Sequence, residues 1–152
     1  MFRTRGKYVY TAKFKKDIRC PLEFGLEVFG GRWKSRVICV LAHHGTLRYS
    51  EIRKEMGNVT DAVLSATLKE LIGYNIVERI QYNEIPPRVE YFLSDSGKSI
   101  MPILNSICKW AGNHLKTLNT TEFDIVAVKA EISKSDDCAI CDYKNHKRER
   151  AQ

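Results

Sequence analysis

The period of hydrophobic and polar residues changes near the middle of the chain, between Ile76 and Leu93. An apolar run from Ile76 ends at Pro86-Pro87, and a second, alternating run returns through Val89, Tyr91 and Leu93. Alternation with a period of two is typical of β-strands, and a proline pair marks a turn between them. The segment therefore predicts a β-hairpin.

Directly before this hairpin, Thr60 to Tyr74 has the spacing of an amphipathic helix. Thr60 is a good N-cap, and Asp61 in the first turn suits the positive end of the helix dipole. Gly73 and Asn75 favour the end of the helix. The expected apolar stripe consists of Val63, Leu64, Leu68, Leu71 and Ile72.

Two helices are predicted at the start of the folded part. The first follows Cys20-Pro21, contains Leu22 to Phe29 and is closed by Gly30-Gly31, because glycine accepts the left-handed conformation that ends many helices. The second contains Trp33, Val37, Val40 and Leu41 at helical spacing and reaches a turn at His43-His44-Gly45.

A brief strand and a helix of about two turns are expected between that turn and Thr60. Thr46 to Tyr49 suits the strand, and Ser50 begins a helix that ends at Met56-Gly57-Asn58. A helix followed by a short hairpin, in a small basic protein, is the outline of a winged helix that docks on DNA.

A long helix is predicted after the hairpin, capped by Ser94 or Asp95. Pro102 should kink this helix or mark its first turn. The apolar stripe is longer than a small core needs, so we expect it to meet a second copy of the chain. The predicted dimer contacts are Ile100, Ile103, Leu104, Ile107, Cys108, Ala111 and Leu115.

These elements predict a mainly α fold with a small β-hairpin (α+β), a winged helix-turn-helix that dimerises through its terminal helices. We expect a basic N-terminal arm over residues 1–19, the winged domain with its dimerisation helix over 20–118, and a partly disordered extension over 119–152. A chain of 152 residues suits one sizeable core with tails.

The distribution of charge adds to this picture more than the net charge of +7 does. Residues 1–19 hold seven basic side chains and one acidic one, a net charge of +6, whereas residues 20–141 are close to neutral. The arm either follows DNA phosphates or is an unstructured solubility tail. Neutralising about five phosphates would steepen the salt dependence of log affinity by roughly −4 to −5.

A cytoplasmic location is expected from two features of the sequence. No apolar segment approaches the roughly 20 residues of a membrane-spanning helix, and the basic N-terminus lacks the apolar core of a signal peptide. The five cysteines are odd in number and scattered, which argues against a secreted disulfide framework. We expect no membrane partner.

The polar side of the helix that begins at Thr60 is lined by unusually small side chains. Small residues let a helix backbone approach base edges in the major groove, whereas a merely solvated side usually carries Lys, Glu and Gln. Asp61 either accepts from a cytosine amino group or only caps the helix. The expected contacts of this helix with DNA are Thr60, Asp61, Ala62, Ser65, Ala66, Thr67 and Lys69.

Four further residues are candidates for contacts with phosphates: Arg48, Ser50, Arg53 and Arg88. Arg88 is expected at the return bend of the wing, where an arginine has little core to serve. The alternative for Arg48 and Arg53 is a surface ion pair with Glu51 or Glu55.

The placed elements resemble the HxlR family of bacterial winged helix-turn-helix regulators over about residues 20–114. The residues that carry the resemblance are Cys20-Pro21, Gly30-Gly31-Arg32-Trp33-Lys34, Arg48-Tyr49-Ser50-Glu51-Ile52, Leu64, Leu68-Lys69-Glu70-Leu71, Ile85-Pro86-Pro87-Arg88-Val89-Glu90-Tyr91, Gly97, Pro102-Ile103-Leu104 and Trp110. The resemblance implies a dimeric transcription factor with its fourth helix in the major groove. The long arm, the residues after about 118 and Gly57-Asn58 depart from the family pattern.

Cys20 is a candidate regulatory thiol because it precedes a helix N-terminus, which favours the thiolate. The resemblance implies sensing at this Cys-Pro position, and the alternative is a small buried residue. An oxidant or a small molecule would be the effector. Cys138, Cys141 and His146 offer two or three zinc ligands, but a closed site needs four, so we expect no metal.

Catalysis is not expected, because no nucleophile, base and orienting group form a local signature and no glycine-rich phosphate loop is present. We therefore expect no cofactor. The predicted function is a dimeric, sequence-specific regulator that binds double-stranded DNA at an inverted-repeat operator. The alternative is a winged helix used as a protein-interaction module without sequence-specific DNA binding.

Overall fold

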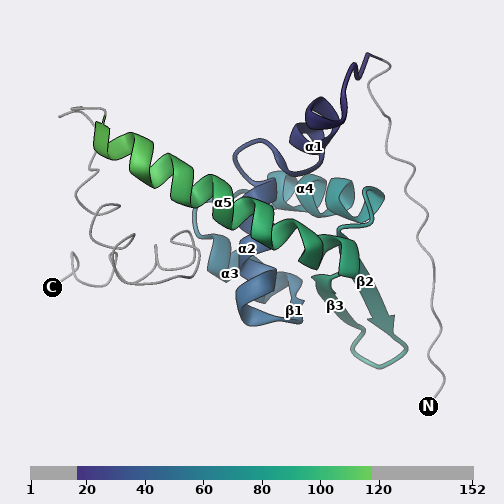
Figure 1. Ribbon diagram of the computed structural model, residues 1–152. Helices are drawn as coiled ribbons and strands as arrows, with labels where there is room; N and C mark the ends of the chain where they lie inside the picture. The colour runs from purple at the N-terminus through teal and green to yellow at the C-terminus, as the bar shows by residue number, and fades with distance from the viewer. Residues whose placement is uncertain (1–16, 118–152) are drawn as a thin grey trace, which may run out of the picture. The chain divides into compact units, whose positions relative to one another are not determined.

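The computed structural model describes residues 17–117 of the chain, which form five helices and three strands (Figure 1). In chain order these are α1 (Pro21–Phe29), α2 (Lys34–His44), β1 (Leu47–Arg48), α3 (Tyr49–Met56), α4 (Asp61–Gly73), β2 (Val77–Tyr82), β3 (Arg88–Leu93) and α5 (Asp95–Thr117). Within the described residues, Lys98 ends one compact unit and Ser99 begins a second one. Helix α5 begins in the first unit and continues in the second. The predicted mainly α fold with a small hairpin is confirmed.

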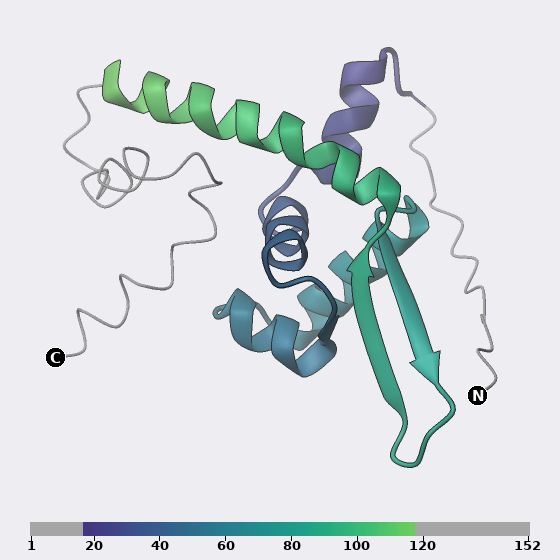
Figure 2. The same cartoon turned by 60° about the horizontal axis from the view of Figure 1, so that its bottom comes forward.

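The sheet is antiparallel, with β3 between β1 and β2. In the β2–β3 hairpin, Val77 lies opposite Leu93 and Tyr82 lies opposite Arg88. Figure 2 shows this hairpin extending beyond the helices of the first unit as a wing. Arg88 therefore opens a paired strand, and its predicted place in the return bend is wrong.

The core of the first unit lies where α2, α3 and α4 meet the base of the hairpin. Its buried side chains include Val37, Ile38, Leu41, Ile52, Met56, Val59, Leu64, Leu68, Leu71, Ile76, Val77 and Leu93. Val63 was expected in the apolar stripe of α4, but it is 37% exposed. The stripe is therefore narrower than the sequence pattern predicts.

Capping residues fix the ends of α4 much as the sequence predicts. The backbone N–H of Val63 donates to Oγ1 of Thr60 at 3.3 Å, which satisfies one of the orphan donors at the helix start. At the other end, α4 stops at Gly73, and Asn75 adopts a positive φ of 57°. The predicted N-cap and the predicted end of the helix are both confirmed.

Ser94 joins the hairpin to the first turn of α5. Its Oγ donates to the carbonyl of Asn75 at 2.6 Å and accepts from the N–H of Gly97 at 3.0 Å. Its own backbone N–H donates to the carbonyl of Ile76 at 3.0 Å. Of the two predicted caps of α5, Ser94 is the one that accepts a helix N–H.

Lys34 connects α2 with α1 and α4. Its ammonium donates to the carbonyl of Glu27 at 2.7 Å and lies 2.9 Å from a carboxylate oxygen of Glu70. The same ammonium lies 5.4 Å from the centre of the Tyr74 ring. One partly buried side chain thus contacts both α1 and α4.

In the second unit, Pro102 lies inside α5, well after the first turn, so the expectation that it marks that turn is wrong. Ile103, Ile107 and Trp110 expose 51%, 43% and 66% of their surface. The indole of Trp110 stacks on His114 with ring centres 5.2 Å apart. Among the described helices, none has the length and apolar content needed to cross a membrane.

Candidate nucleic-acid interface

Helix α4 has one buried side and one side lined by small, exposed residues. Leu64, Leu68 and Leu71 point into the core. The exposed side holds Ala62, Ser65, Ala66 and Lys69, together with Thr60 and Asp61 at the helix start. Except for Lys69, these six side chains are short. Another helix or a DNA duplex can therefore approach the backbone of α4 closely.

Thr67 does not belong to this exposed side. It is only 7% exposed, and its hydroxyl donates to the carbonyl of Val63 at 2.8 Å. This local bond satisfies the hydroxyl within the helix, as is common for threonine in helices. The prediction that Thr67 contacts DNA is therefore corrected, because its side chain faces the core.

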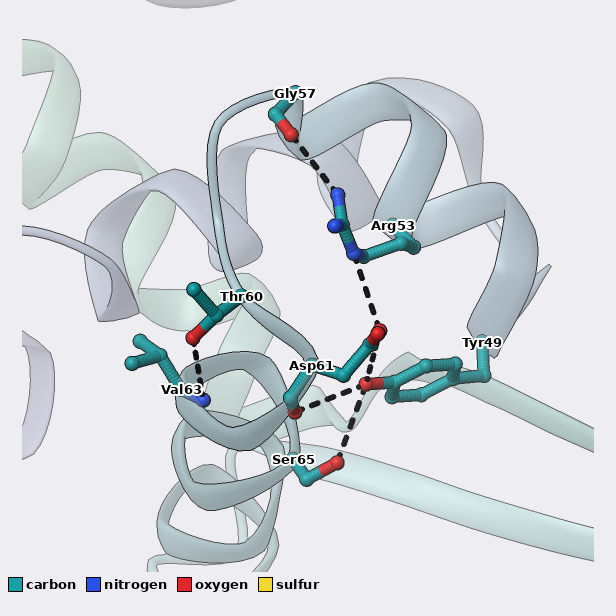
Figure 3. A network of polar contacts seen from close by, with 7 residues as sticks. All are labelled: Tyr49, Arg53, Gly57, Thr60, Asp61, Val63 and Ser65. Atoms are coloured by element: carbon teal, nitrogen blue, oxygen red, sulfur yellow. Dashed lines mark hydrogen bonds and ion pairs between the residues drawn. The ribbon is translucent and has the colours of Figure 1, made fainter.

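A polar network connects the start of α3 with the first turn of α4 (Figure 3). The hydroxyl of Tyr49 lies 3.1 Å from the carbonyl oxygen of Asp61, 3.2 Å from Oδ1 of Asp61 and 3.2 Å from Oγ of Ser65. Nε of Arg53 donates to the same Oδ1 at 3.1 Å. Through another nitrogen, Arg53 also donates to the carbonyl of Gly57 at 2.9 Å.

This network changes the expected roles of Arg53 and Asp61. Arg53 pairs with Asp61, so the alternative partners Glu51 and Glu55 are wrong for it. Asp61 does not cap α4, because Thr60 does, and its Oδ1 already accepts from Arg53 and Tyr49. The pairing places a positive charge beside the only carboxylate in the first turn of α4.

Arg48 and Ser50 lie just before and inside the first turn of α3, and both are exposed. The backbone N–H of Arg48 donates to the carboxylate of Glu51 at 2.7 Å. Glu51 therefore holds the helix start, as in half of a capping box. Arg48 is the last residue of β1, and Ser50 is the second residue of α3.

On the wing, Arg88 is held by three neighbours. Its guanidinium carbon lies 3.8 Å from the centre of the Tyr82 ring, and its nitrogens lie 3.0 Å from Glu84 and 3.3 Å from Glu90. Arg88 serves no core contact, as expected, but its guanidinium is held by neighbours on the wing itself. Any contact of Arg88 with a phosphate would have to compete with two carboxylates.

Cys20 is exposed at the N-cap position of α1. It is therefore not a small buried residue, which was the alternative to a reactive thiol. Arg19 lies beside it, but the guanidinium of Arg19 pairs with Asp17 at 3.3 Å. Cys39 is buried in α2. Cys138, Cys141 and His146 lie outside the described residues, and within residues 17–117 no group of three metal-binding side chains occurs.

The predicted dimer contacts on α5 differ in how exposed their side chains are. Ile103 and Ile107 are exposed, Cys108 and Ala111 are partly exposed, and Ile100 and Leu104 are buried. The side chain of Leu115 lies outside the described set. Helix α1 also exposes apolar side chains, chiefly Leu22 and Leu26.

Sequence reasoning missed two residues at these surfaces. The pattern predicts no side-chain contact for Tyr49, yet its hydroxyl lies at the centre of the α3–α4 network. A tyrosine at the start of a short amphipathic helix is a usable signal, because a phenolic hydroxyl near a surface usually finds a partner. Trp110 was not included among the dimer contacts, although it exposes more surface than either isoleucine.

Comparison with known proteins gives the same assignment as the fold. The family model for the HxlR-like helix-turn-helix matches residues 28–119. An uncharacterized HTH-type transcriptional regulator, YtcD of Bacillus subtilis (strain 168), is 39% identical over 112 residues, which cover 74% of this chain and 88% of that protein. An uncharacterized HTH-type transcriptional regulator of Methanothermobacter thermautotrophicus is 43% identical over 98 residues, covering 62% of this chain and 74% of its own length.

Among solved structures, the redox regulator HypR in its oxidized form matches with a TM-score of 0.57 and 35% identity. The match covers 62% of this chain and 96% of the HypR chain. The family model spans more than half of the chain, and the relatives are HTH-type transcriptional regulators. The chain belongs to the HxlR-like helix-turn-helix family.

Proposed function

We propose that this protein is a dimeric, sequence-specific DNA-binding transcriptional regulator. The observation that carries the proposal is the exposed side of α4, where Ala62, Ser65 and Ala66 lie opposite a fully buried leucine side. Such a helix can enter the major groove, because its small side chains allow close approach to base edges. Acting on DNA, the protein would work in the cytoplasm.

The small and polar residues at the start and on the exposed side of α4 have distinct proposed tasks. The methyl groups of Ala62 and Ala66 contact thymine methyls, and Lys69 reaches a phosphate or a guanine. Thr60 holds the helix start, whose N–H groups face the duplex backbone. Ser65 contacts a base edge. Asp61 supports its neighbours through Arg53 and Tyr49 instead of contacting a base.

Phosphate contacts would come from both sides of the helix pair. Arg48 and Ser50 flank the start of α3, and Arg53 can offer a phosphate the guanidinium N–H groups that do not bond Asp61 or Gly57. Arg88 would join them from the wing after leaving Glu84. The basic arm of residues 1–19 adds sequence-independent attraction.

The dimer is proposed to form through the exposed apolar side chains of α5 and α1. Ile103, Ile107 and Trp110 recur at helical spacing on one side of α5, and contiguous exposed apolar patches often mark interaction sites. A two-fold dimer carries two copies of α4, which fit successive major grooves about 34 to 36 Å apart. The operator would then be an inverted repeat.

Cys20 is proposed as the regulatory thiol, with an oxidant or another electrophile as effector. Its exposure at the N-terminus of α1 and the similarity to the redox regulator HypR support this role. We expect a quinone or a disulfide reagent to abolish DNA binding by the parent and to leave the Cys20→Ser protein active. Equal loss of binding in both proteins would rule out Cys20.

Selection of double-stranded DNA fragments by the purified full-length protein tests the proposed function. We expect an inverted repeat with half-site centres about 10 base pairs apart to be enriched. A folded protein that enriches no sequence over random competitor, at modest ionic strength, would favour the protein-interaction module instead. The small, neutral side of α4 argues against that alternative, since protein-binding surfaces favour large aromatic anchors.

A further inference from the structure

Ser65 lies on the exposed side of α4 and contacts the hydroxyl of Tyr49. The two hydroxyl oxygens lie 3.2 Å apart, although the residues belong to different helices (Figure 3). The same Tyr49 oxygen lies 3.1 Å from the carbonyl oxygen of Asp61 and 3.2 Å from its Oδ1. Three oxygens therefore surround one phenolic proton.

The chemistry of these oxygens decides where the protons lie. A backbone carbonyl and an ionised carboxylate only accept hydrogen bonds, whereas a serine hydroxyl both donates and accepts. If Tyr49 donated to Ser65, the lone pairs of the phenol would face both oxygens of Asp61 at about van der Waals contact or closer. Tyr49 must donate to Asp61, and Ser65 must then donate to Tyr49.

Arg53 and Gly57 keep the carboxylate in place. Nε of Arg53 donates to Oδ1 of Asp61 at 3.1 Å, and its other contact, to the carbonyl of Gly57, is 2.9 Å long. The guanidinium is therefore held at two points. The chain of donors runs in one direction, from Ser65 through Tyr49 to Asp61.

We propose that Tyr49 is a positioning residue that makes Ser65 an acceptor for a base in the major groove. With its only proton used by Tyr49, Ser65 offers lone pairs alone to a partner. Adenine N6 and cytosine N4 are the major-groove amino donors, whereas the polar edge atoms of guanine and thymine accept. The position facing Ser65 should therefore be adenine or cytosine.

This inference rests on the proposed DNA-binding function and specifies its base preference. A serine that rotates freely can donate or accept, so it discriminates poorly between bases. Tyr49 would make Ser65 discriminate between bases, although Tyr49 itself does not contact the DNA. Tyr49→Phe removes one oxygen and keeps the ring, which separates this role from packing.

The first experiment selects DNA fragments with the full-length parent and three variants. We expect Ser65→Ala to lose the preference at one position of each half-site, and the parent to show adenine or cytosine there. Tyr49→Phe should accept guanine or thymine at that same position. Tyr82→Phe is the matched control, because it also removes a hydroxyl bonded to a carboxylate, that of Glu90, but on the wing.

The second experiment needs no substitution at Tyr49. Full-length parent is titrated with the selected operator and with a copy in which a base analogue lacks only the amino group at that position. We expect the parent to lose about two- to tenfold in affinity, as for one hydrogen bond. Ser65→Ala should bind both operators equally.

The outcomes separate this inference from the proposed function. If the parent enriches no sequence, the proposed function fails and the inference falls with it. If the parent enriches an operator but shows guanine or thymine where Ser65→Ala loses preference, only the inference is overturned. The same holds if Tyr49→Phe leaves that preference unchanged, or if the parent binds the analogue as tightly as the natural base.

Discussion

Close contacts of Ser94 and Gly97 fix the backbone conformation at the junction between the hairpin and α5. Ser94 and Gly97 lie there within hydrogen-bond distance of each other, and Ser94 is buried. A Cβ atom added to Gly97 would overlap the carbonyl oxygen of Ile76 and come within 3.2 Å of Leu93. A glycine is required at position 97 because the backbone of Ile76 comes too close to leave room for a Cβ atom.

Gly97→Ala should therefore destabilise the protein by about 1–3 kcal/mol, the usual cost of forcing extra volume into a packed site. The free energy of unfolding in urea measures the effect. Gly25→Ala in α1 is the control, because its Cβ would meet only the edge of the Phe29 ring at 3.4 Å. There, helix propensity predicts equal or greater stability. Equal stability of the Gly97→Ala protein and the parent would contradict the expected overlap.

A second prediction at the residue scale concerns the two carboxylates beside Arg88. Glu84→Gln removes the partner at 3.0 Å and leaves the guanidinium with Glu90 alone. Since exposed ion pairs contribute about 0.2–1 kcal/mol, we expect operator affinity to rise by up to about fivefold. Fluorescence anisotropy with labelled operator measures this change.

Glu78→Gln is the matched control, because it removes the same charge from an exposed position on β2. A rise of equal size in both variants would show that net charge acts, and not the release of Arg88. No rise in either variant would place the wing outside the interface.

At the scale of elements, the hydrophobic pattern predicted each helix and strand of residues 17–117 closely. Short local signals were sufficient: Thr60 before α4, Gly30-Gly31 after α1 and the proline pair in the hairpin. Each signal acts within a few residues, so the sequence displays it directly. The element bounds depend little on tertiary contacts.

The contacts between elements could not be predicted in the same way. Arg53 pairs with Asp61, eight residues away across the turn, and Tyr49 contacts Ser65 on the next helix. Such pairs depend on how α3 packs on α4, which the period of one helix does not encode. Thr67 was misplaced for a related reason, because its position on the helical wheel lies at the border of the buried side.

Lys34 provides a prediction at this scale, because its side chain connects three helices. Lys34→Met should lower the free energy of unfolding by about 1–3 kcal/mol, since the carboxylate of Glu70 and the carbonyl of Glu27 lose their donor. Lys98→Met is the control, because Lys98 is exposed and its pair with Asp95 is 3.5 Å long. We expect that variant to stay within about 0.5 kcal/mol of the parent. Similar losses in both variants would argue against a special role of Lys34.

At the scale of the whole molecule, DNA binding would depend on two copies of the chain acting together. One α4 covers a single half-site, and a two-fold dimer doubles the contacts at a fixed spacing. The apolar side chains of α5 that are exposed in one copy, Ile103, Ile107 and Trp110, would become buried in the dimer.

Replacing Ile107 by Glu should therefore produce a monomer, because a charge in an apolar contact costs several kcal/mol unless it is paired. Sedimentation velocity would report the mass, and anisotropy would show weaker binding to the full operator with unchanged binding to an isolated half-site. Lys109→Glu changes an exposed polar position of the same helix and should remain dimeric. A dimeric Ile107→Glu protein would move the interface elsewhere.

The central position of β3 also determines how the domain would respond to mechanical load. β3 pairs with β1 at Tyr91 and Glu90, and β1 ends at Arg48, the residue directly before Tyr49. A displacement of the hairpin tip would be passed through β3 and β1 to Tyr49, the first residue of α3. A duplex that displaces the wing would therefore also shift the start of α3, and with it the Tyr49 hydroxyl that is bonded to Ser65.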